Sequence, residues 1–232
     1  LNEARDPGRP GFSLGKSLFM IRNHSETMDR FDVVNLGDGS LGPQGTLDRG
    51  YKTSQADPWA VWGNHVYTVM YGEAYHAELR DDGTFSGFDK VDIFGERCGA
   101  VGGAVAVVET GGGPYFYSIN GWSYGGGGLP DRVMNEVYGA PINPDGSLGE
   151  FFDAGRMPVG TQRSTAVSLP SALLVMGGFT SNHWTSSTAI REICRAPVGD
   201  DGRLGSCDIL STTLPWGAAF VNAWVTEDDR TL

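Results

Sequence analysis

Short apolar stretches alternate with glycine-containing polar turns along the chain. Four windows of 17 residues share one pattern, with Asp as the eleventh residue and Gly as the twelfth. They span residues 28–44, 72–88, 135–151 and 191–207. In each window two apolar segments flank the Asp-Gly pair, and glycine readily adopts the positive φ that such turns require. The alternating acidic ligands of a calcium loop are absent. The pattern therefore predicts four β-hairpins.

A second apolar element precedes each hairpin. Its copies end at Asn23, Gly72, Gly121 and Gly178, and a fifth copy ends at Asp228. The period of the repeat is therefore about 50 residues, and a period of this length with about four short strands is typical of a β-propeller. Each repeat is then one blade, and the packing of neighbouring blades supplies the core because one blade cannot bury both of its faces alone.

The fourth repeat has the most specific sequence features. The strand "ALLVMGG" ends in Gly177-Gly178, the lead-in at residues 156–167 precedes it, and an Asp-Gly turn follows. In these features the sequence resembles the kelch-like family of β-propellers, and the resemblance covers most of the chain. It implies an all-β fold, a β-propeller of four-stranded antiparallel blades with four complete repeats plus part of a fifth. We expect residues 1–232 to be a single domain that is part of a longer propeller.

The repeats are divergent. Outside the fourth repeat the double glycine is replaced by Arg22-Asn23, Tyr71-Gly72 and Asn120-Gly121. Kelch-like propellers serve as glycan binders, protein-interaction modules and enzymes, so the resemblance predicts the fold and leaves the function open.

Composition and charge limit the kinds of partner that the protein is expected to bind. The chain has 232 residues, 35 of them Gly, and a net charge of −11. The negative field disfavours binding to nucleic acid or to an anionic membrane. No apolar run approaches the roughly 18 residues of a membrane span, so no membrane insertion is expected.

Two of the three cysteines are predicted to form a disulfide. Cys194 and Cys207 are the fourth and seventeenth residues of the last window. The same positions carry aromatic pairs in the second and third windows, Tyr75 with Phe88 and Tyr138 with Phe151. A four-residue turn would place the two cysteines directly opposite each other, whereas a three-residue turn would place them on opposite faces as two buried thiols. A disulfide would indicate an extracellular or cell-surface location, with the periplasm as an alternative. Cys98 is interpreted as a small core residue.

Two long connections are candidate binding segments. Residues 120–131 contain Trp122 and Tyr124, and residues 179–188 contain Asn182, His183 and Trp184. Aromatic rings among hydrogen-bonding groups suit a sugar, which is apolar on its faces and polar at its rim. The alternative is that the tryptophans pack between blades.

The segments that lead into the first strand of each repeat supply a second candidate set. Trp59, Arg97, Arg163 and Trp216 lie there, and in kelch-like proteins such positions often face the central channel. Arginines in the channel would bind a carboxylate or an acidic glycan bidentately. The alternative is a structural role, with the arginines donating to loop carbonyls.

Enzymatic signals are weak. The four histidines are His24, His65, His76 and His183, and the last is the only one in a candidate binding segment. No nucleophile, zinc-protease or phosphate-binding motif is present. The sequence therefore favours a non-catalytic extracellular binding module for a glycan or a protein, with no cofactor and no metal. The alternatives are a propeller enzyme that acts on a sugar, resembling kelch-like sialic-acid mutarotases or copper oxidases, and a structural building block of a surface assembly.

Overall fold

A computed structural model of the chain describes residues 11–14, 17–24, 28–35, 37, 40, 45–48, 58–70, 72–80, 85–92, 100–101, 103–126, 129–181 and 188–217. Over these residues the regular structure is β-strand throughout, and none of them lies in a helix. The predicted all-β class is therefore confirmed.

The strands form four antiparallel sheets, in each of which the four main strands follow one another in chain order. The first sheet contains β1 (Gly11–Leu14), β2 (Ser17–His24), β3 (Met28–Asn35) and β4 (Gly45–Asp48). The second contains β5 (Trp59–Trp62), β6 (His65–Met70), β7 (Glu73–Glu78) and β8 (Asp89–Asp92). The third contains β10 (Ala104–Thr110), β11 (Gly113–Gly126), β12 (Leu129–Pro141) and β13 (Phe152–Arg156), and the short β9 (Ala100–Val101) pairs with the far end of β11. The fourth contains β14 (Thr165–Leu169), β15 (Ala172–Met176), β16 (Ile193–Pro197) and β17 (Asp208–Ile209).

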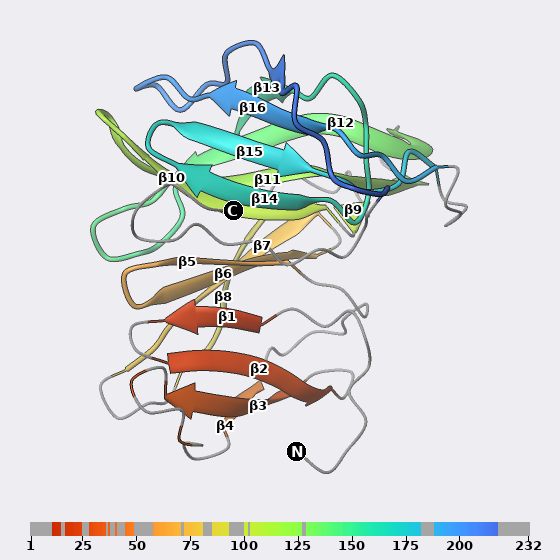
Figure 1. Cartoon of the computed structure of the whole chain (residues 1–232). Coiled ribbons are helices and arrows are strands. Elements are labelled where there is room, and N and C mark those ends of the chain that lie inside the picture. Colours follow the sequence, from red (N-terminus) through yellow and green to blue (C-terminus); the bar gives the residue numbers. More distant parts are fainter. Residues whose placement is uncertain are drawn as a thin grey trace.

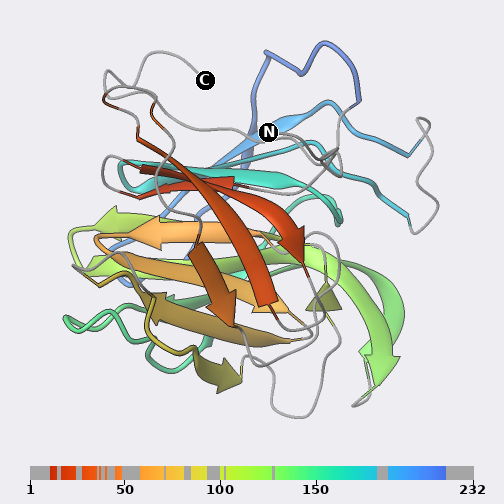
Figure 2. The same cartoon turned by 90° about the horizontal axis from the view of Figure 1, so that it is seen from below.

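In Figure 1 the first sheet lies at the bottom, the second lies above it, and the third and fourth sheets overlap at the top. The first strand of each sheet contacts the first strand of the next, so that β1 contacts β5, β5 contacts β10, and β10 contacts β14. The strands of the first sheet run obliquely to those of the second (Figure 2). This arrangement makes each sheet a structural unit that packs on its neighbours in sequence.

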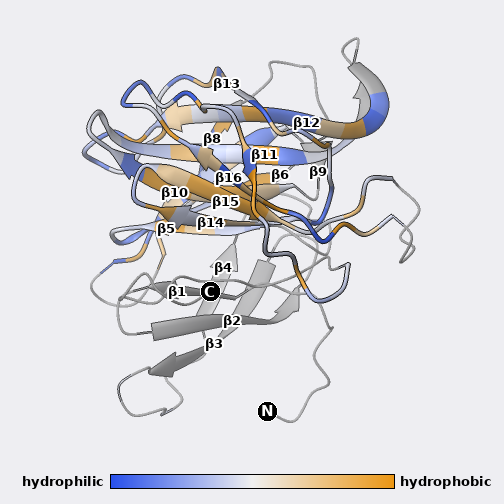
Figure 3. Cartoon of the chain, turned by 45° about the horizontal axis from the view of Figure 1, so that its top comes forward, coloured by the Kyte–Doolittle hydropathy of each residue, from blue (hydrophilic) through white to orange (hydrophobic). Residues whose placement is uncertain are grey.

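Apolar side chains fill the space between the second and third sheets and between the third and fourth. Tyr67 of the second sheet and Phe116 of the third belong to one buried cluster, and Tyr117 of the third and Leu173 of the fourth belong to another. All four side chains are fully buried. Burial of a side chain of this size stabilises a fold by about 2 kcal/mol. Apolar residues are concentrated along β10, β14 and β15, where the third and fourth sheets meet (Figure 3).

The fourth sheet is apolar on both faces. Leu173 and Val175 of β15 pack toward the third sheet, whereas Leu174 and Met176 belong to a separate buried cluster. Side chains alternate between the two faces of a strand. The unbroken apolar run of β15 therefore reflects burial on both sides.

A register shift of one residue follows the Asp-Gly turn of the third sheet. An isolated bridge pairs Ile142 with Leu148 next to the turn. A continuous ladder would then set Gly139 opposite Phe151, but Gly139 lies opposite Phe152. The same shift occurs in two other sheets, between the pairs Leu79–Phe85 and His76–Asp89 and between the pairs Val198–Leu204 and Arg195–Asp208. Because side chains alternate, such a shift exchanges the faces of all later residues.

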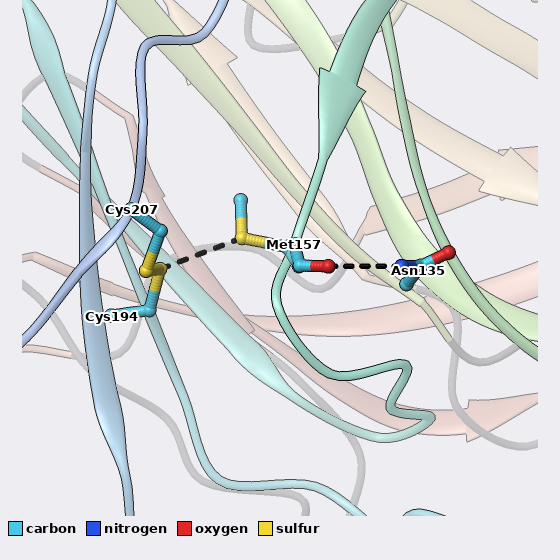
Figure 4. The surroundings of a disulfide bond; sticks show 4 residues. All are labelled: Asn135, Met157, Cys194 and Cys207. Atoms are coloured by element: carbon cyan, nitrogen blue, oxygen red, sulfur yellow. Dashed lines mark hydrogen bonds between the residues drawn. A yellow bond between two sulfur atoms is a disulfide. The ribbon is translucent and has the colours of Figure 1, made fainter.

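The shift decides the geometry of the cysteines (Figure 4). The predicted disulfide between Cys194 and Cys207 is present, with 5.8 Å between the Cα atoms. Neither predicted arrangement holds, because Cys194 lies opposite Ile209 and still bonds to Cys207. The turn is closed by the Gly199 amide, which donates to the carbonyl oxygen of Arg203 at 2.9 Å, so three residues form the loop. The register shift sets Ile209 opposite Cys194. Cys207 is two residues before Ile209, so its side chain lies on the same face of the sheet as that of Cys194.

The aromatic pair of the second sheet occupies the equivalent diagonal position. The rings of Tyr75 and Phe88 contact each other edge to face with 6.2 Å between their centres. Tyr75 lies opposite Lys90, just as Cys194 lies opposite Ile209. The joint replacement of an aromatic pair by a cysteine pair thus conserves a cross-strand contact.

A tyrosine hydroxyl joins each of two sheets to the Asp-Gly turn of the next. The Tyr67 hydroxyl donates to the carbonyl oxygen of Gly146 at 2.8 Å, and the Tyr117 hydroxyl donates to that of Gly202 at 2.7 Å. Gly146 and Gly202 have φ values of 82° and 76°, as predicted for the turn glycines. Burial raises the pKa of both tyrosines, so their hydroxyls remain neutral donors. These hydrogen bonds fix the spacing of consecutive sheets.

Removal of either hydroxyl should destabilise the protein. We expect Tyr67→Phe and Tyr117→Phe each to lower the free energy of unfolding by about 1–2 kcal/mol, because a glycine carbonyl at the sheet interface loses its donor. Tyr115→Phe is the control, since Tyr115 donates to the carbonyl oxygen of Asp200 at an exposed position. Its cost should be below about 0.5 kcal/mol. Urea unfolding followed by fluorescence measures all three, and equal losses would contradict the assigned role of the two buried hydroxyls.

Candidate functional site

Two segments that are distant in sequence meet at the end of the third and fourth sheets. The amide of Gly121 in β11 donates to the carbonyl oxygen of Thr161 at 2.8 Å, and the Asn120 side-chain amide donates to the Thr161 hydroxyl at 2.7 Å. Thr161 lies in the connection between β13 and β14. Trp122 directly follows Gly121, and Arg163 is two residues after Thr161. The structure therefore brings together members of both predicted binding sets, and we call residues 120–123 and 161–164 the junction.

Both segments of the junction have unusual backbones. Asn120 and Arg163 each have a φ of 59°. Non-glycine residues rarely adopt this region, asparagine being among the more tolerant. Asn120 takes the place of the first glycine of the double-glycine pair, which in the fourth sheet is Gly177 with a φ of 64°. No comparable sequence pattern explains the positive φ of Arg163. Strained backbones of this kind are concentrated at functional sites.

The close approach of the connection explains the double glycine. A Cβ atom on Gly178 would lie 2.8 Å from the carbonyl oxygen of Gln162 and 3.0 Å from the Cβ of Thr161. The main chains of Gln162 and Phe179 also exchange two hydrogen bonds, at 2.9 and 2.8 Å. The connection between β13 and β14 is therefore wedged between the ends of β11 and β15.

The junction contains buried polar side chains. Asn120, Thr161, Gln162 and Ser164 are each less than a tenth exposed. The Gln162 side-chain amide donates to the carbonyl oxygen of Ser181 at 2.6 Å. The Oδ1 atom of Asn120 and the hydroxyl of Ser164 have no hydrogen-bond partner among the residues that the structure describes. These two groups retain the capacity to hydrogen-bond a water molecule or a ligand.

Trp122 lies on a projecting ribbon. The expectation of a loop at residues 120–131 is wrong, because β11 continues to Gly126 and β12 begins at Leu129. Trp122 is half-buried and lies opposite Val133 on one side and Val101 of β9 on the other. The ribbon forms because glycine is concentrated at its tip, whereas Trp122, Tyr124 and Val133 are residue types that favour strands. It extends beyond the neighbouring strands (Figure 3).

An ion pair stiffens the base of this ribbon. Arg132 donates to the carboxylate of Glu136, and both residues are in β12. Burial opposes ionisation of Glu136, but the Arg132 hydrogen bond and local amide donors outweigh it and hold the Glu136 pKa below its usual range. The main-chain amide of Asn135 also donates to Glu136 at 3.0 Å. The β11–β12 ribbon therefore leaves the sheet next to the Arg132–Glu136 ion pair.

The remaining predicted residues lie away from the junction contacts or outside the described residues. For Tyr124 only the main chain is described, which pairs with Asp131. Cys98, the possible fifth-repeat strands after Gly217, and the binding residues Arg97, Asn182, His183 and Trp184 lie outside the described residues. Trp59 contacts the ring of Phe88 with 6.2 Å between centres, as a packing residue does. Trp216 is 70% exposed.

The sequence analysis missed Asn120, Thr161, Gln162 and Ser164. One signal was present, since Asn120-Gly121 stands where the fourth repeat has its double glycine. The contact partner of that pair, residues 161–164, could not be inferred because it comes from the following repeat. No group of His, Cys, Asp or Glu side chains that could hold a metal ion occurs within the described part of the chain. The same residues contain no helix long and apolar enough to cross a membrane.

Comparison with known proteins shows similarity in fold alone. No family model matches the sequence, and no curated protein matches it. The fold itself is common among solved structures, with 160 matching chains. One of these is the structure of YjhT, which superimposes on 83% of this chain with a TM-score of 0.55 and 11% sequence identity. The matched region corresponds to 52% of the YjhT chain, so this chain spans about half the length of that protein.

Proposed function

We propose that the four sheets are blades of a kelch-like β-propeller and that the propeller is a non-catalytic binding module. Its ligand is a glycan or a protein partner, recognised at the end that carries the junction and the β11–β12 ribbon. The propeller architecture is supported by four consecutive four-stranded sheets whose first strands contact one another in order. It is further supported by the equivalent hydrogen bonds from Tyr67 and Tyr117 to the next turn.

The junction is the observation that carries the binding proposal. Buried hydrogen bonds and two left-handed residues hold Trp122 and Arg163 on adjacent segments. Positioning a site on such rigid elements keeps the entropy lost on binding small. A tryptophan together with buried amide and hydroxyl groups on adjacent segments supplies the group types that suit the apolar faces and polar rim of a sugar ring. Among the two ligand classes, the chemistry of the junction favours a glycan.

Among the residues whose side chains are described, the two histidines support a binding module over an enzyme. His65 and His76 are buried in the second sheet, where they contact each other and not the junction. A sugar isomerase or oxidase would need acid–base groups converging on one pocket. The disulfide Cys194–Cys207 is compatible with an extracellular or periplasmic location, where a secreted or surface-attached binding module would act.

Binding to a glycan array tests the proposal. Trp122→Ala should weaken binding of the recognised glycan by about tenfold or more, since a buried aromatic contact often contributes above 1.4 kcal/mol. Arg163→Gln should also weaken it. Arg203→Gln is the matched control, because Arg203 lies in an Asp-Gly turn at the opposite end of the strands. Calorimetry on the strongest glycan gives the affinities.

The melting temperature separates binding from packing. A binding role predicts that Trp122→Ala keeps the wild-type melting temperature while affinity falls. If the variant instead melts well below the wild type and binds normally when folded, Trp122 packs between sheets and the proposal fails. If no glycan on the array binds the wild-type protein, the glycan form of the proposal is refuted.

A further inference from the structure

Two buried histidines form a hydrogen-bonded pair in the second sheet. The Nδ1 atom of His65 in β6 lies 2.9 Å from the Nε2 atom of His76 in β7. The two residues are 8% and 6% exposed. The Trp62 ring stacks on His65, and the Tyr67 ring stacks on His76, so that an aromatic ring covers each imidazole. The pair has no room to rearrange without moving these rings.

The pair is the surface on which the Asp-Gly turn of the third sheet rests. Gly146 of that turn lies so close to His65 that a Cβ atom would be 2.2 Å from the imidazole Cε1. Tyr67, which stacks on His76, donates its hydroxyl to the Gly146 carbonyl oxygen. The histidines therefore take part in the joint between the second and third sheets.

The charged groups around the pair are few and mostly solvent-facing. The His76 Nδ1 atom lies 4.0 Å from a carboxylate oxygen of Asp89 in β8, whose side chain is 84% exposed. Asp145 of the opposing turn and Glu78 of β7 also act on His76. Glu109 of β10 accepts a hydrogen bond from Trp62 at 2.9 Å. Exposed carboxylates at such distances compensate a buried positive charge only weakly.

Proton counting shows how the joint responds to acid. Two neutral imidazoles share one N–H between them, and a single added proton gives an imidazolium that still donates to its neutral partner. A second added proton leaves two N–H groups facing each other at 2.9 Å, and the contact is lost. We propose that the His65–His76 pair is an acid-sensitive joint that releases the Gly146 turn, and with it the contact between the second and third sheets, as the pH falls.

The direction of the effect follows from the native pKa. Burial, and then the neighbouring His65, lower the His76 pKa below its usual value, while Asp89, Asp145 and Glu78 act in the opposite sense. In the unfolded or opened chain the histidine pKa has its ordinary value of about 6.5. Below this pH the opened chain therefore binds more protons than the closed joint. The stabilising contribution is thus complete above about pH 7 and is lost as the pH falls through 6.5 toward the native pKa.

The next joint along the chain provides an internal control. There Tyr117 donates to Gly202 as Tyr67 donates to Gly146. The positions that correspond to His65 and His76 are Tyr115 and Gly139, from their places relative to Tyr117 in the strand pairing. The third and fourth sheets therefore meet through the same hydrogen bond without a titrating pair.

Hydrogen exchange at the two turn glycines tests the proposal within one molecule. The Gly146 amide donates to Asn143 at 2.8 Å, and the Gly202 amide donates to Gly199 at 2.9 Å. After correction for intrinsic exchange, lowering the pH from 7.5 to 5.0 should increase exchange at Gly146 at least tenfold more than at Gly202. This follows because each proton taken up on opening can contribute up to about tenfold per pH unit.

Variants identify the origin of the response. His76→Gln should remove the extra pH dependence at Gly146 and His65→Gln should reduce it, whereas both variants should leave Gly202 unchanged. Imidazole NMR titration of the wild-type protein provides a second measurement that needs no variant, and it should show His76 titrating below pH 6.5. Equal pH responses at the two glycines, or a Gly146 response that survives His76→Gln, would overturn the proposal.

Discussion

Replacing Gly146 by alanine will destabilise the protein far more than replacing Gly63 by alanine. Both glycines have left-handed backbones, with φ values of 82° and 58°. A Cβ atom on Gly63 would meet nothing within 4 Å, whereas one on Gly146 would lie 2.2 Å from the His65 ring. Gly63→Ala therefore measures the backbone cost alone, about 1–2 kcal/mol. Gly146→Ala adds the cost of overpacking.

The His65 ring cannot move aside to accommodate the new methyl group. It is held at 2.9 Å by His76 and is covered by the Trp62 ring. We therefore expect a total loss of roughly 2–5 kcal/mol for Gly146→Ala, the sum of backbone strain and overpacking. In a domain of this size the melting temperature should fall by about 4–20 °C. Differential scanning calorimetry of both variants measures the difference, and similar melting temperatures would show that the turn does not rest on His65.

Loss of the Cys194–Cys207 disulfide should have an effect of similar size. The bond closes a loop with a sequence separation of 13 residues, and disulfides closing loops of this length typically contribute about 2–4 kcal/mol. It also packs in the core, where the Cys194 sulfur lies 3.7 Å from the Met157 sulfur (Figure 4). Met157 is in turn held by Asn135, which donates to its carbonyl oxygen at 3.0 Å.

The reduced protein and the double variant Cys194→Ala/Cys207→Ala provide the measurement. Each should melt about 5–12 °C below the oxidised wild type, from the expected free energy and the size of the chain. Reductant should leave the melting temperature of the double variant unchanged, which separates loss of this bond from other effects of the reagent. A wild-type protein whose melting temperature does not respond to reduction would contradict a structural role for the disulfide.

Local chemistry in the sequence was sufficient to predict the described strands, two Asp-Gly turns and the disulfide partners, whereas Asp38-Gly39 and Asp82-Gly83 lie outside the described residues. Asp145-Gly146 and Asp201-Gly202 form turns because glycine reaches positive φ without a steric penalty. The apolar run of β15 forms a strand buried on both faces because its residues alternate between faces. Cys194 and Cys207 could be paired because they replace an aromatic pair at equivalent repeat positions. Each of these inferences depends on residues within one repeat.

Contacts between repeats had to come from the tertiary structure. The Tyr67 hydroxyl reaches Gly146 across 79 residues of sequence, and Asn120 reaches Thr161 across 41. Whether such groups meet depends on how one sheet is stacked and rotated on the next. Residue types within one repeat do not determine this stacking. The loop expected at residues 120–131 became a ribbon for a related reason, since its strands pair with each other and with β9.

The sequence by itself therefore determined the repeating all-β architecture, because turn and strand preferences act over a few residues and recur with each repeat. Only the tertiary structure decided the register shift that orients Cys207, the packing of His65 against His76 under a turn of the next sheet, and the junction that brings the segment of Trp122 against the segment of Arg163. These features depend on the side-chain face and the sheet spacing, and a displacement of one residue along a strand would abolish each of them.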